Sequence, residues 1–252
     1  MNTITAALCA AAATAPAMGG FATINFDTED DFLSPLVNGQ EINPAASPAG
    51  EFGILVDFVG LNGSRLAIFD TDASGPNAGG GDPDLLVNEG NALIVQNTSL
   101  LTQSTADIFD TPNDNVGGAF RIDLVTPGEV GSIDLIDINA GGQTTLTLTD
   151  QNGLQRVYNV PSNWSNQAPT PMGFDTLSLL TTLPQDGEGP GGDAVVTFED
   201  AGYDQTAVAS IRFDIAGSAA FDNIVINSLV PAPGALTLLA GAGFAGLRRR
   251  RA

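Results

Sequence analysis

Carboxylates are the side chains of this sequence best suited to chemistry, and one short run spaces them as a calcium loop does. Asp70, Asp72 and Ser74 place oxygen atoms at alternate positions and Gly75 stands sixth, as at the start of such a loop. Gly81 occupies the position of the closing acid, and calcium's flexible geometry allows a rearranged cage. The alternative is a polar turn whose Asp and Ser side chains cap their own backbone. The candidate ligands are Asp70, Asp72, Asp82 and Asp84.

A second pair of acids lies near the two ends of the same region. Asp27 follows Phe26 near its start, and Asp222 follows Phe221 near its end, within the run Asp-Asn-Ile. If the first and last strands are neighbours, these two carboxylates lie close together. The arrangement resembles carbohydrate-binding modules of the jelly-roll, galactose-binding-like kind. The resemblance implies that Asp27 and Asp222 share a structural calcium ion, and it implies a sugar-binding role; the alternative is that both are polar residues at strand ends.

Sugar recognition usually uses an aromatic face, and this sequence offers few of them. It has one Trp and two Tyr, and Trp164 stands in the polar run Ser-Asn-Trp-Ser-Asn. An exposed Trp in such a loop would indicate ligand binding. Trp164 is therefore the candidate ligand-stacking residue. The alternative is an indole that folds back and closes an edge of the core.

The composition excludes several classes of function. With no His and no Lys, imidazole catalysis, His-ligated zinc, Schiff-base chemistry and a Walker-type phosphate loop are ruled out. All 29 acids lie between Asp27 and Asp222 against four arginines, so the body has a net charge of −25 and repels phosphate backbones. We therefore expect no nucleic-acid partner. There is no G-x-S-x-G motif, and among so many acids a chance carboxylate pair is no sign of a glycosidase, so we expect no enzymatic activity.

The region that must position these groups, residues 23–229, has the pattern of a β-domain. Short apolar and β-branched segments are separated by turns rich in Gly, Asp and Pro, and helix signals are nearly absent. Alternation is strictest in Ala119–Val125, and we expect Gly131–Ile138, which carries Asp134 and Asp137, as a separate strand. An inward Asp needs a partner, for which we expect one of the body's arginines. About ten to twelve strands predict an all-β, antiparallel, jelly-roll-like sandwich.

Both ends of the chain carry targeting patterns. Residues 1–22 form an apolar, Ala-rich stretch followed by small residues, which predicts a signal peptide cut after Ala17 or near Ala22. Residues 230–252 combine a proline motif, an apolar run at 235–247 that predicts a short hydrophobic helix, and an arginine cluster. The domains expected are thus 1–22, 23–229 and 230–252.

The C-terminal pattern resembles the PEP-CTERM sorting signal of exported bacterial surface proteins. It departs from that signal at Ala232, where the family name implies Glu. The resemblance implies an exosortase-type processing enzyme as a partner and transient anchoring in the inner membrane; the alternative is a plain C-terminal anchor helix. The residues that carry the resemblance are Pro231, Pro233, Arg248, Arg249, Arg250 and Arg251.

These patterns lead to one functional expectation with one alternative. We expect a non-enzymatic protein that is exported to the cell surface or the extracellular matrix, where polysaccharide is a candidate partner. The alternative is a carbohydrate-binding, lectin-like module whose loops are held by calcium. Calcium is the structural cofactor in both interpretations.

Overall fold

The computed structural model describes residues 20–42, 52–79, 83–97, 103–105, 108–114, 117–138, 142–165 and 174–228. Phe21–Ser228 forms one compact unit. The remaining unit, Met1–Gly20 with Leu229–Ala252, lies outside the described residues except for Gly20. Of the expected signal peptide, only residues 20–22 are described, and they begin strand β1; the expected C-terminal helix lies outside the described residues. In the described part of the chain, no helix is both long and apolar enough to span a bilayer.

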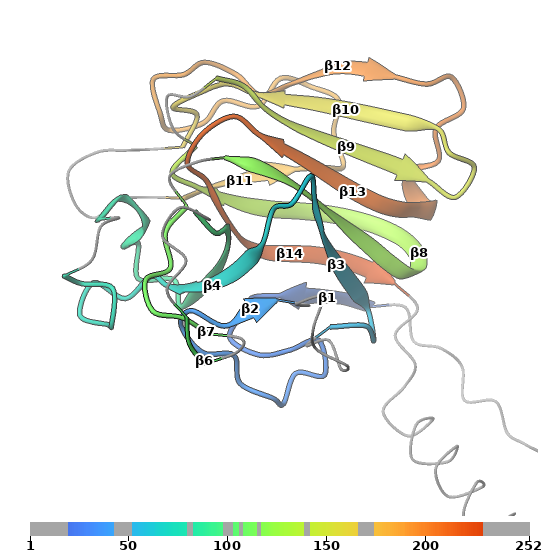
Figure 1. Ribbon diagram of the computed structural model, residues 1–252. Helices are drawn as coiled ribbons and strands as arrows, with labels where there is room; N and C mark the ends of the chain where they lie inside the picture. The colour runs from blue at the N-terminus through green and yellow to red at the C-terminus, as the bar shows by residue number, and fades with distance from the viewer. Residues whose placement is uncertain are drawn as a thin grey trace, which may run out of the picture. The chain divides into compact units, whose positions relative to one another are not determined.

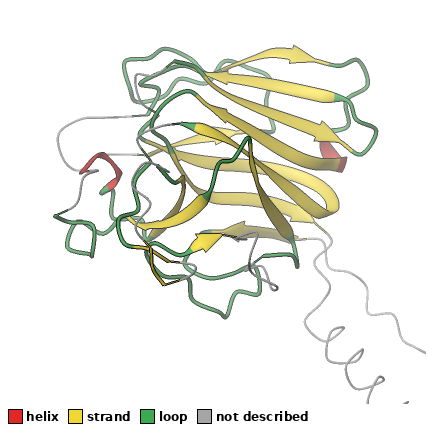
Figure 2. Ribbon diagram, viewed as in Figure 1, coloured by secondary structure: helices red, strands yellow, loops and turns green. Residues whose placement is uncertain are grey.

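The regular secondary structure of the described residues is almost entirely β-strand, and loops connect the strands (Figure 2). Twelve strands form one antiparallel sheet in the order β12-β10-β9-β13-β8-β14-β5-β4-β2, with β1 on β14 and with β3 and β11 on β8 (Figure 1). The 3-10 turns are η1 (Pro83–Leu85) and η3 (Gln205–Ala207). The all-β, antiparallel prediction is confirmed. The strands are β1 (Gly20–Ile24), β2 (Glu41–Ile42), β3 (Val56–Leu61), β4 (Leu66–Asp70), β5 (Asn91–Val95), β6 (Gln103–Thr105), β7 (Ile108–Phe109), β8 (Gly118–Ile136), β9 (Thr144–Asp150), β10 (Gln155–Val160), β11 (Phe174–Ser178), β12 (Val195–Glu199), β13 (Val208–Ile215) and β14 (Ala220–Ser228).

Strand β8 is the longest element and connects two sets of strands. Its first part pairs with β3 and β13, and its second part pairs with β14 and β11. The two segments expected as separate strands are thus one strand, because residues 125–127 stay extended and exposed where a turn was expected. Strand β8 bends between its two parts (Figure 1). A register shift in its pairing with β13, between Val208 and Ser210, accommodates this bend.

Apolar side chains from distant parts of the sequence meet along β8. Phe120 stacks on Phe213 of β13 with ring centroids 4.4 Å apart, and Phe221 of β14 contacts the two rings edge-on at 5.2 and 4.9 Å. All three side chains are fully buried. The alternation of apolar and polar residues along β8 directs one set of side chains into this core and leaves Arg121 and Asp123 outside it.

The loop before β5 is held against the sheet by its own apolar residues. Leu85 and Val87 pack in a buried cluster with Phe69 of β4 and Ala92 of β5. Residues 88–90, which follow directly, are therefore fixed beside the end of β4. This loop brings polar groups to the place where β4 ends and β5 begins.

The expected ion pair between an arginine and an acid of the 131–138 segment was wrong. Asp134 accepts hydrogen bonds from Thr176 Oγ1 at 2.5 Å and Asn223 Nδ2 at 2.9 Å. The register explains this result, because Thr176 of β11 lies directly opposite Asp134 and Asn223 follows its partner on β14. Asp137 accepts from Ser218 Oγ at 2.6 Å. Arg121, Arg156 and Arg212 instead pair with Asp123, Glu199 and Asp214.

Candidate cation-binding site

An acidic pocket of about 350 Å³ lies where β4 ends, β5 begins and the chain leaves β1. Asp70 closes β4 and lies directly opposite Asn91, the first residue of β5. Asp27 reaches the same place from the N-terminal end of the body. Two acidic segments that the sequence suggested as separate calcium sites thus contribute to one pocket. Its lining residues are Asp27, Asp70, Asp72, Asn88, Gly90 and Asn91.

Asp27 is fixed by the backbone at the start of β5. Its Oδ1 accepts a hydrogen bond from the Asn91 amide at 3.1 Å, and its Oδ2 accepts one from Asn25 Nδ2 at 3.2 Å. Gly90 has φ of +88°, and a Cβ there would lie 2.6 Å from Asp27 Oδ1. Only glycine meets both the conformation and the close approach at this position.

The loop after β4 is built from side chains that cap their own backbone. Asp70 Oδ1 accepts from the Asp72 amide at 2.9 Å, and Asp72 Oδ1 accepts from the amide and hydroxyl of Ser74, both at 2.8 Å. These bonds from Ser74 hold the pKa of Asp72 below its ordinary value. The polar-turn alternative therefore describes the loop well, and the turn keeps Asp72 ionised beside Asp70 and Asp27.

Asp222, the acid expected to share a calcium ion with Asp27, does not line the pocket. Its side chain is 1% exposed, its Oδ1 accepts from the Asn223 amide at 2.7 Å, and its Oδ2 has no hydrogen-bond partner. The pKa of Asp222 is raised to about 8, chiefly by burial and in addition by the negative charges of Asp134, Asp27 and Glu89. The hydrogen bond from the Asn223 amide opposes this rise. A buried carboxylate with an orphan oxygen among like charges requires either a proton or a cation.

The donor chemistry of the pocket fits calcium. Calcium prefers carboxylate, amide and carbonyl oxygens, and the pocket offers three carboxylates and two Asn side chains. Within the described residues no three acidic side chains already converge as a formed metal centre. Asp27, Asp70 and Asp72 are the residues that would hold the ion, and its charge would offset the repulsion that Asp222 experiences.

The remaining predicted ligands and sorting residues are placed apart or fall outside the described chain. Asp84 belongs to η1, is partly exposed and does not line the pocket. The residues outside the description are Asp82, Pro231, Pro233, Arg248, Arg249, Arg250 and Arg251.

Sequence reasoning missed the contribution of the turn that precedes β5. Asn88 and Asn91 line the pocket, and Glu89 lies close enough to affect the pKa of Asp222. The run Asn-Glu-Gly-Asn at 88–91, placed directly before an apolar strand, was the signal that could have identified it.

Trp164 lies in the core and has no exposed face for a sugar. It is 1% exposed, and its Nε1 donates to the Gln185 carbonyl at 3.0 Å. Gly187 covers it so closely that a Cβ there would lie 2.9 Å from the indole. The structure thus argues against a ligand-stacking role and agrees with an indole that closes the edge of the core.

No protein-family model matches the sequence, and no curated protein is significantly similar to it. The structure therefore defines the protein only by its architecture. It is an all-β protein with one large antiparallel sheet and an acidic pocket beside β5.

Proposed function

We propose that this chain is a non-enzymatic protein of the cell surface or extracellular matrix, with a β-domain that calcium stabilises. The observation that carries the calcium part of this proposal is the buried Oδ2 of Asp222, which has no hydrogen-bond partner. The pKa of the Asp222 carboxyl group is raised by burial and by the nearby charges of Asp27 and Glu89. Extracellular calcium modules work at dissociation constants of about 10⁻⁴ to 10⁻³ M. Asp70 and Asp72 accept hydrogen bonds from backbone amides of their own loop. Because a bound calcium ion would compete with these bonds, we expect affinity in this weak range.

We further propose that the sheet is folded over into a jelly-roll-like sandwich. The bend of β8 supports this architecture, because it lets one strand serve two sets of partners. The contact of Phe221 with Phe120 and Phe213 also supports it, since these rings come from the two sets. Side chains that interdigitate from two inner faces are typical of a sandwich core.

Export and sorting rest on the two ends of the chain. The signal-peptide pattern at 1–22 and the proline, apolar and arginine pattern at 230–252 support passage across the inner membrane, followed by recognition by an exosortase-type enzyme. The tail would anchor the protein in that membrane for a time. The net charge of −25 between these ends supports a cation-rich exterior and a neutral or cationic partner.

The calcium proposal is tested by the thermal unfolding of the full chain with calcium and with a chelator. At a hundredfold excess over the dissociation constant, calcium adds about 2.7 kcal/mol to the free energy of unfolding. For a body of this size that gain corresponds to roughly 5–10 °C. We expect this shift with calcium and a smaller one with magnesium, because magnesium dehydrates reluctantly.

Two variants and one control localise the effect. Asp27→Asn is expected to lose the calcium shift. Asp222→Asn, which changes a buried acid outside the pocket lining, should reduce the calcium shift, because the ion no longer relieves a buried carboxylate. In chelator above about pH 8, where Asp222 is ionised, this variant should be at least as stable as the wild type, because it removes a buried charge. Asp84→Asn, an acid outside the pocket, should keep the full shift. A melting curve that calcium and chelator leave unchanged would remove the metal from the proposal.

The second candidate function is carbohydrate binding, and a separate polar cavity favours it. That cavity lies at the ends of β3, β8, β9 and β13, and it does not involve Trp164.

A further inference from the structure

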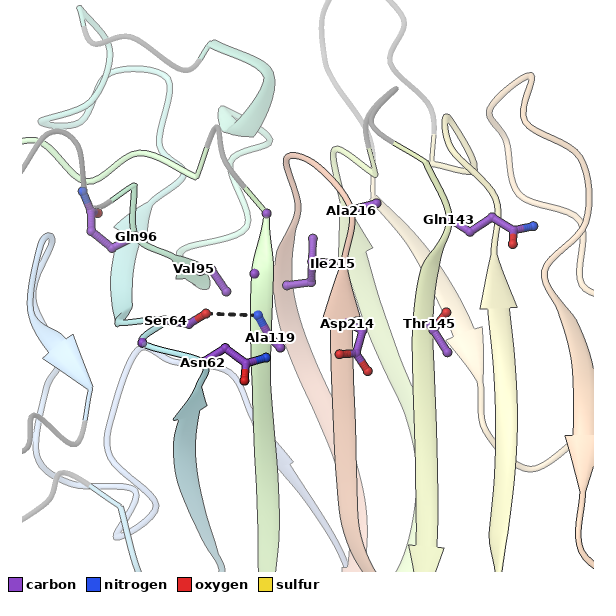
Figure 3. Close-up of a pocket in the computed structure, with 13 residues that line it drawn as sticks. Asn62, Ser64, Val95, Gln96, Ala119, Gln143, Thr145, Asp214, Ile215 and Ala216 are labelled. Carbon is purple, nitrogen blue, oxygen red and sulfur yellow. Dashed lines mark hydrogen bonds between the residues drawn. The ribbon is translucent and has the colours of Figure 1, made fainter.

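A cavity of about 550 Å³ opens at one end of the sheet (Figure 3). Strands β3 and β13 end there, and β8 and β9 begin there, because neighbouring strands run in opposite directions. A volume of this size is typical of small-ligand sites. None of its lining residues belongs to the acidic pocket.

Glycines at the start of β8 let the backbone lie close to the neighbouring walls of the cavity. Gly117 and Gly118 have φ of +63° and +153°. A Cβ on Gly118 would lie 2.7 Å from Ser64 Oγ and 2.8 Å from Val95 Cγ1, and one on Gly117 would lie 2.5 Å from the Ile215 carbonyl. Ala119, directly opposite Asp214, is the next residue. Glycine at positions 117 and 118 therefore permits this close packing, and residues 117–119 form part of the cavity wall with little side-chain bulk.

Polar side chains in the cavity wall are fixed by hydrogen bonds to the protein backbone. Ser64 Oγ accepts from the Ala119 amide at 3.1 Å. Gln96 is fully buried; its Oε1 accepts from the Asn113 amide, and its Nε2 donates to the Thr111 carbonyl. Such walls are preorganised, so a ligand would not have to order them on binding.

The mouth of the cavity carries a row of polar side chains from separate elements. Figure 3 shows Asn62, Asp214 and Thr145 side by side, from the end of β3, from β13 and from β9. Asp214 and Thr145 are directly opposed in the β13–β9 pairing. Gln143 stands above them, and Ile215 supplies an apolar wall. Amide, hydroxyl and carboxylate groups beside a small apolar surface match the hydroxyls and the C–H face of a sugar ring.

Charge selects against acidic ligands at this cavity. Arg212 binds Asp214 with two hydrogen bonds, Nε to Oδ2 at 2.8 Å and Nη2 to Oδ1 at 2.6 Å. Each carboxylate oxygen keeps a lone pair that can accept from a ligand hydroxyl. The other arginines of the described chain, Arg65, Arg121 and Arg156, also pair with acids. A phosphate or carboxylate ligand would meet Asp214 with no spare cation beside it.

We propose that this cavity binds a neutral saccharide, with Asp214 and Asn62 as the principal hydrogen-bonding residues. The proposal rests on the second candidate function, carbohydrate binding, and names its site. It does not depend on calcium at the acidic pocket. The same chemistry would accept a free sugar or one unit of a polysaccharide, and the experiment separates these two sources.

The test is saturation-transfer NMR and calorimetry on the full chain in chelator. The probes are glucose, galactose and mannose, a neutral tetrasaccharide of each, and glucose 6-phosphate and glucuronate as acidic counterparts. We expect a neutral sugar to bind and both acidic probes to fail. A monosaccharide that binds as well as its tetrasaccharide indicates a single-ring site; a tighter tetrasaccharide indicates a polysaccharide ligand.

Two variants and a matched control assign the site. Asp214→Ala and Asn62→Gly are each expected to weaken binding about tenfold or more, the usual effect of losing a hydrogen bond to a charged or buried group. Glycine is chosen at position 62 because Asn62 has φ of +55°. Asp123→Ala breaks the equivalent exposed pair with Arg121, away from the cavity, and should leave binding unchanged.

Three outcomes would overturn the proposal. They are no binding of any neutral probe at millimolar concentration, preferential binding of an acidic probe, or sugar binding that Asp214→Ala and Asn62→Gly leave intact. Because the measurement is made in chelator, a failure here is distinct from a failure of the calcium shift, which is read from unfolding curves.

Discussion

At the scale of single residues, the acids of this protein divide by what surrounds them. Asp150 and Asp222 are both buried, at 2% and 1% exposure. Three backbone amides, from Asn152, Leu154 and Asp204, donate to Asp150, whereas a single amide donates to Asp222. Burial tends to raise the pKa of Asp150, but these bonds outweigh it and the pKa is lowered, whereas that of Asp222 is raised.

The lowered pKa of Asp150 predicts a loss of stability in acid. Its folded pKa is below the unfolded value of about 3.9, so its contribution is complete above that value and is lost as the pH falls through the folded pKa. We expect Asp150→Asn to be less stable than the wild type at pH 7, with a gap that shrinks below about pH 4. Urea unfolding at several pH values measures it. A gap that stays constant down to about pH 2 would contradict this account.

At the scale of elements, the sequence predicted strands well and their boundaries less well. The alternation at 119–125 identified a strand because one face is buried and the other is wet. The continuation through residues 125–127 could not be predicted, because the run Thr-Pro-Gly at 126–128 is equally suited to a turn and to a bend between two sets of partners.

The residues of the acidic pocket could largely be identified from the sequence, whereas those of the sugar cavity could not. The sequence identified Asp27, Asp70, Asp72 and Asp222. The pairing of β4 with β5 places Asp70 opposite Asn91, and the Asn91 amide donates to Asp27, so Asp27, Asp70 and Asp72 share a pocket that Asp222 does not line. The sugar cavity could not be predicted, because Asn62 and Asp214 are 152 positions apart and only the register brings them to one end of the sheet.

Strand β1 makes a prediction about processing, if the chain is exported as proposed. β1 begins at Gly20 and pairs with β14. A cut near Ala22 would remove half of this strand, whereas a cut after Ala17 would leave it intact. We therefore expect the mature protein to begin at Met18, as measured by mass spectrometry of protein recovered from the envelope. A mature N-terminus at or beyond position 23 would show that β1 is dispensable.

At the scale of the whole molecule, charge repulsion is the dominant electrostatic feature. The body carries a net charge of −25, because its four arginines, each paired with a single acid, offset only four of its 29 acids. Self-repulsion of this kind destabilises a compact state, and salt screens it over a Debye length of about 10 Å at 0.1 M. The protein should therefore be more stable in saline surroundings.

This repulsion gives a prediction that is separate from calcium. In chelator, the melting temperature of the full chain is expected to rise as sodium chloride increases from about 0.02 to 0.5 M, because the Debye length falls several-fold. Tetramethylammonium chloride should have the same effect at equal ionic strength. A gain with sodium alone would instead indicate a specific cation site.

The place of β14 in the sheet has a consequence for folding, if the chain is exported as proposed. Among the described strands, β14 lies between β8 and β5, so the β5-β4-β2 group pairs with the rest of the sheet only through residues 220–228. A polypeptide that leaves a translocon N-terminus first cannot complete this seam until those residues emerge. We therefore expect the seam to be among the last parts of the sheet to form on the far side of the membrane.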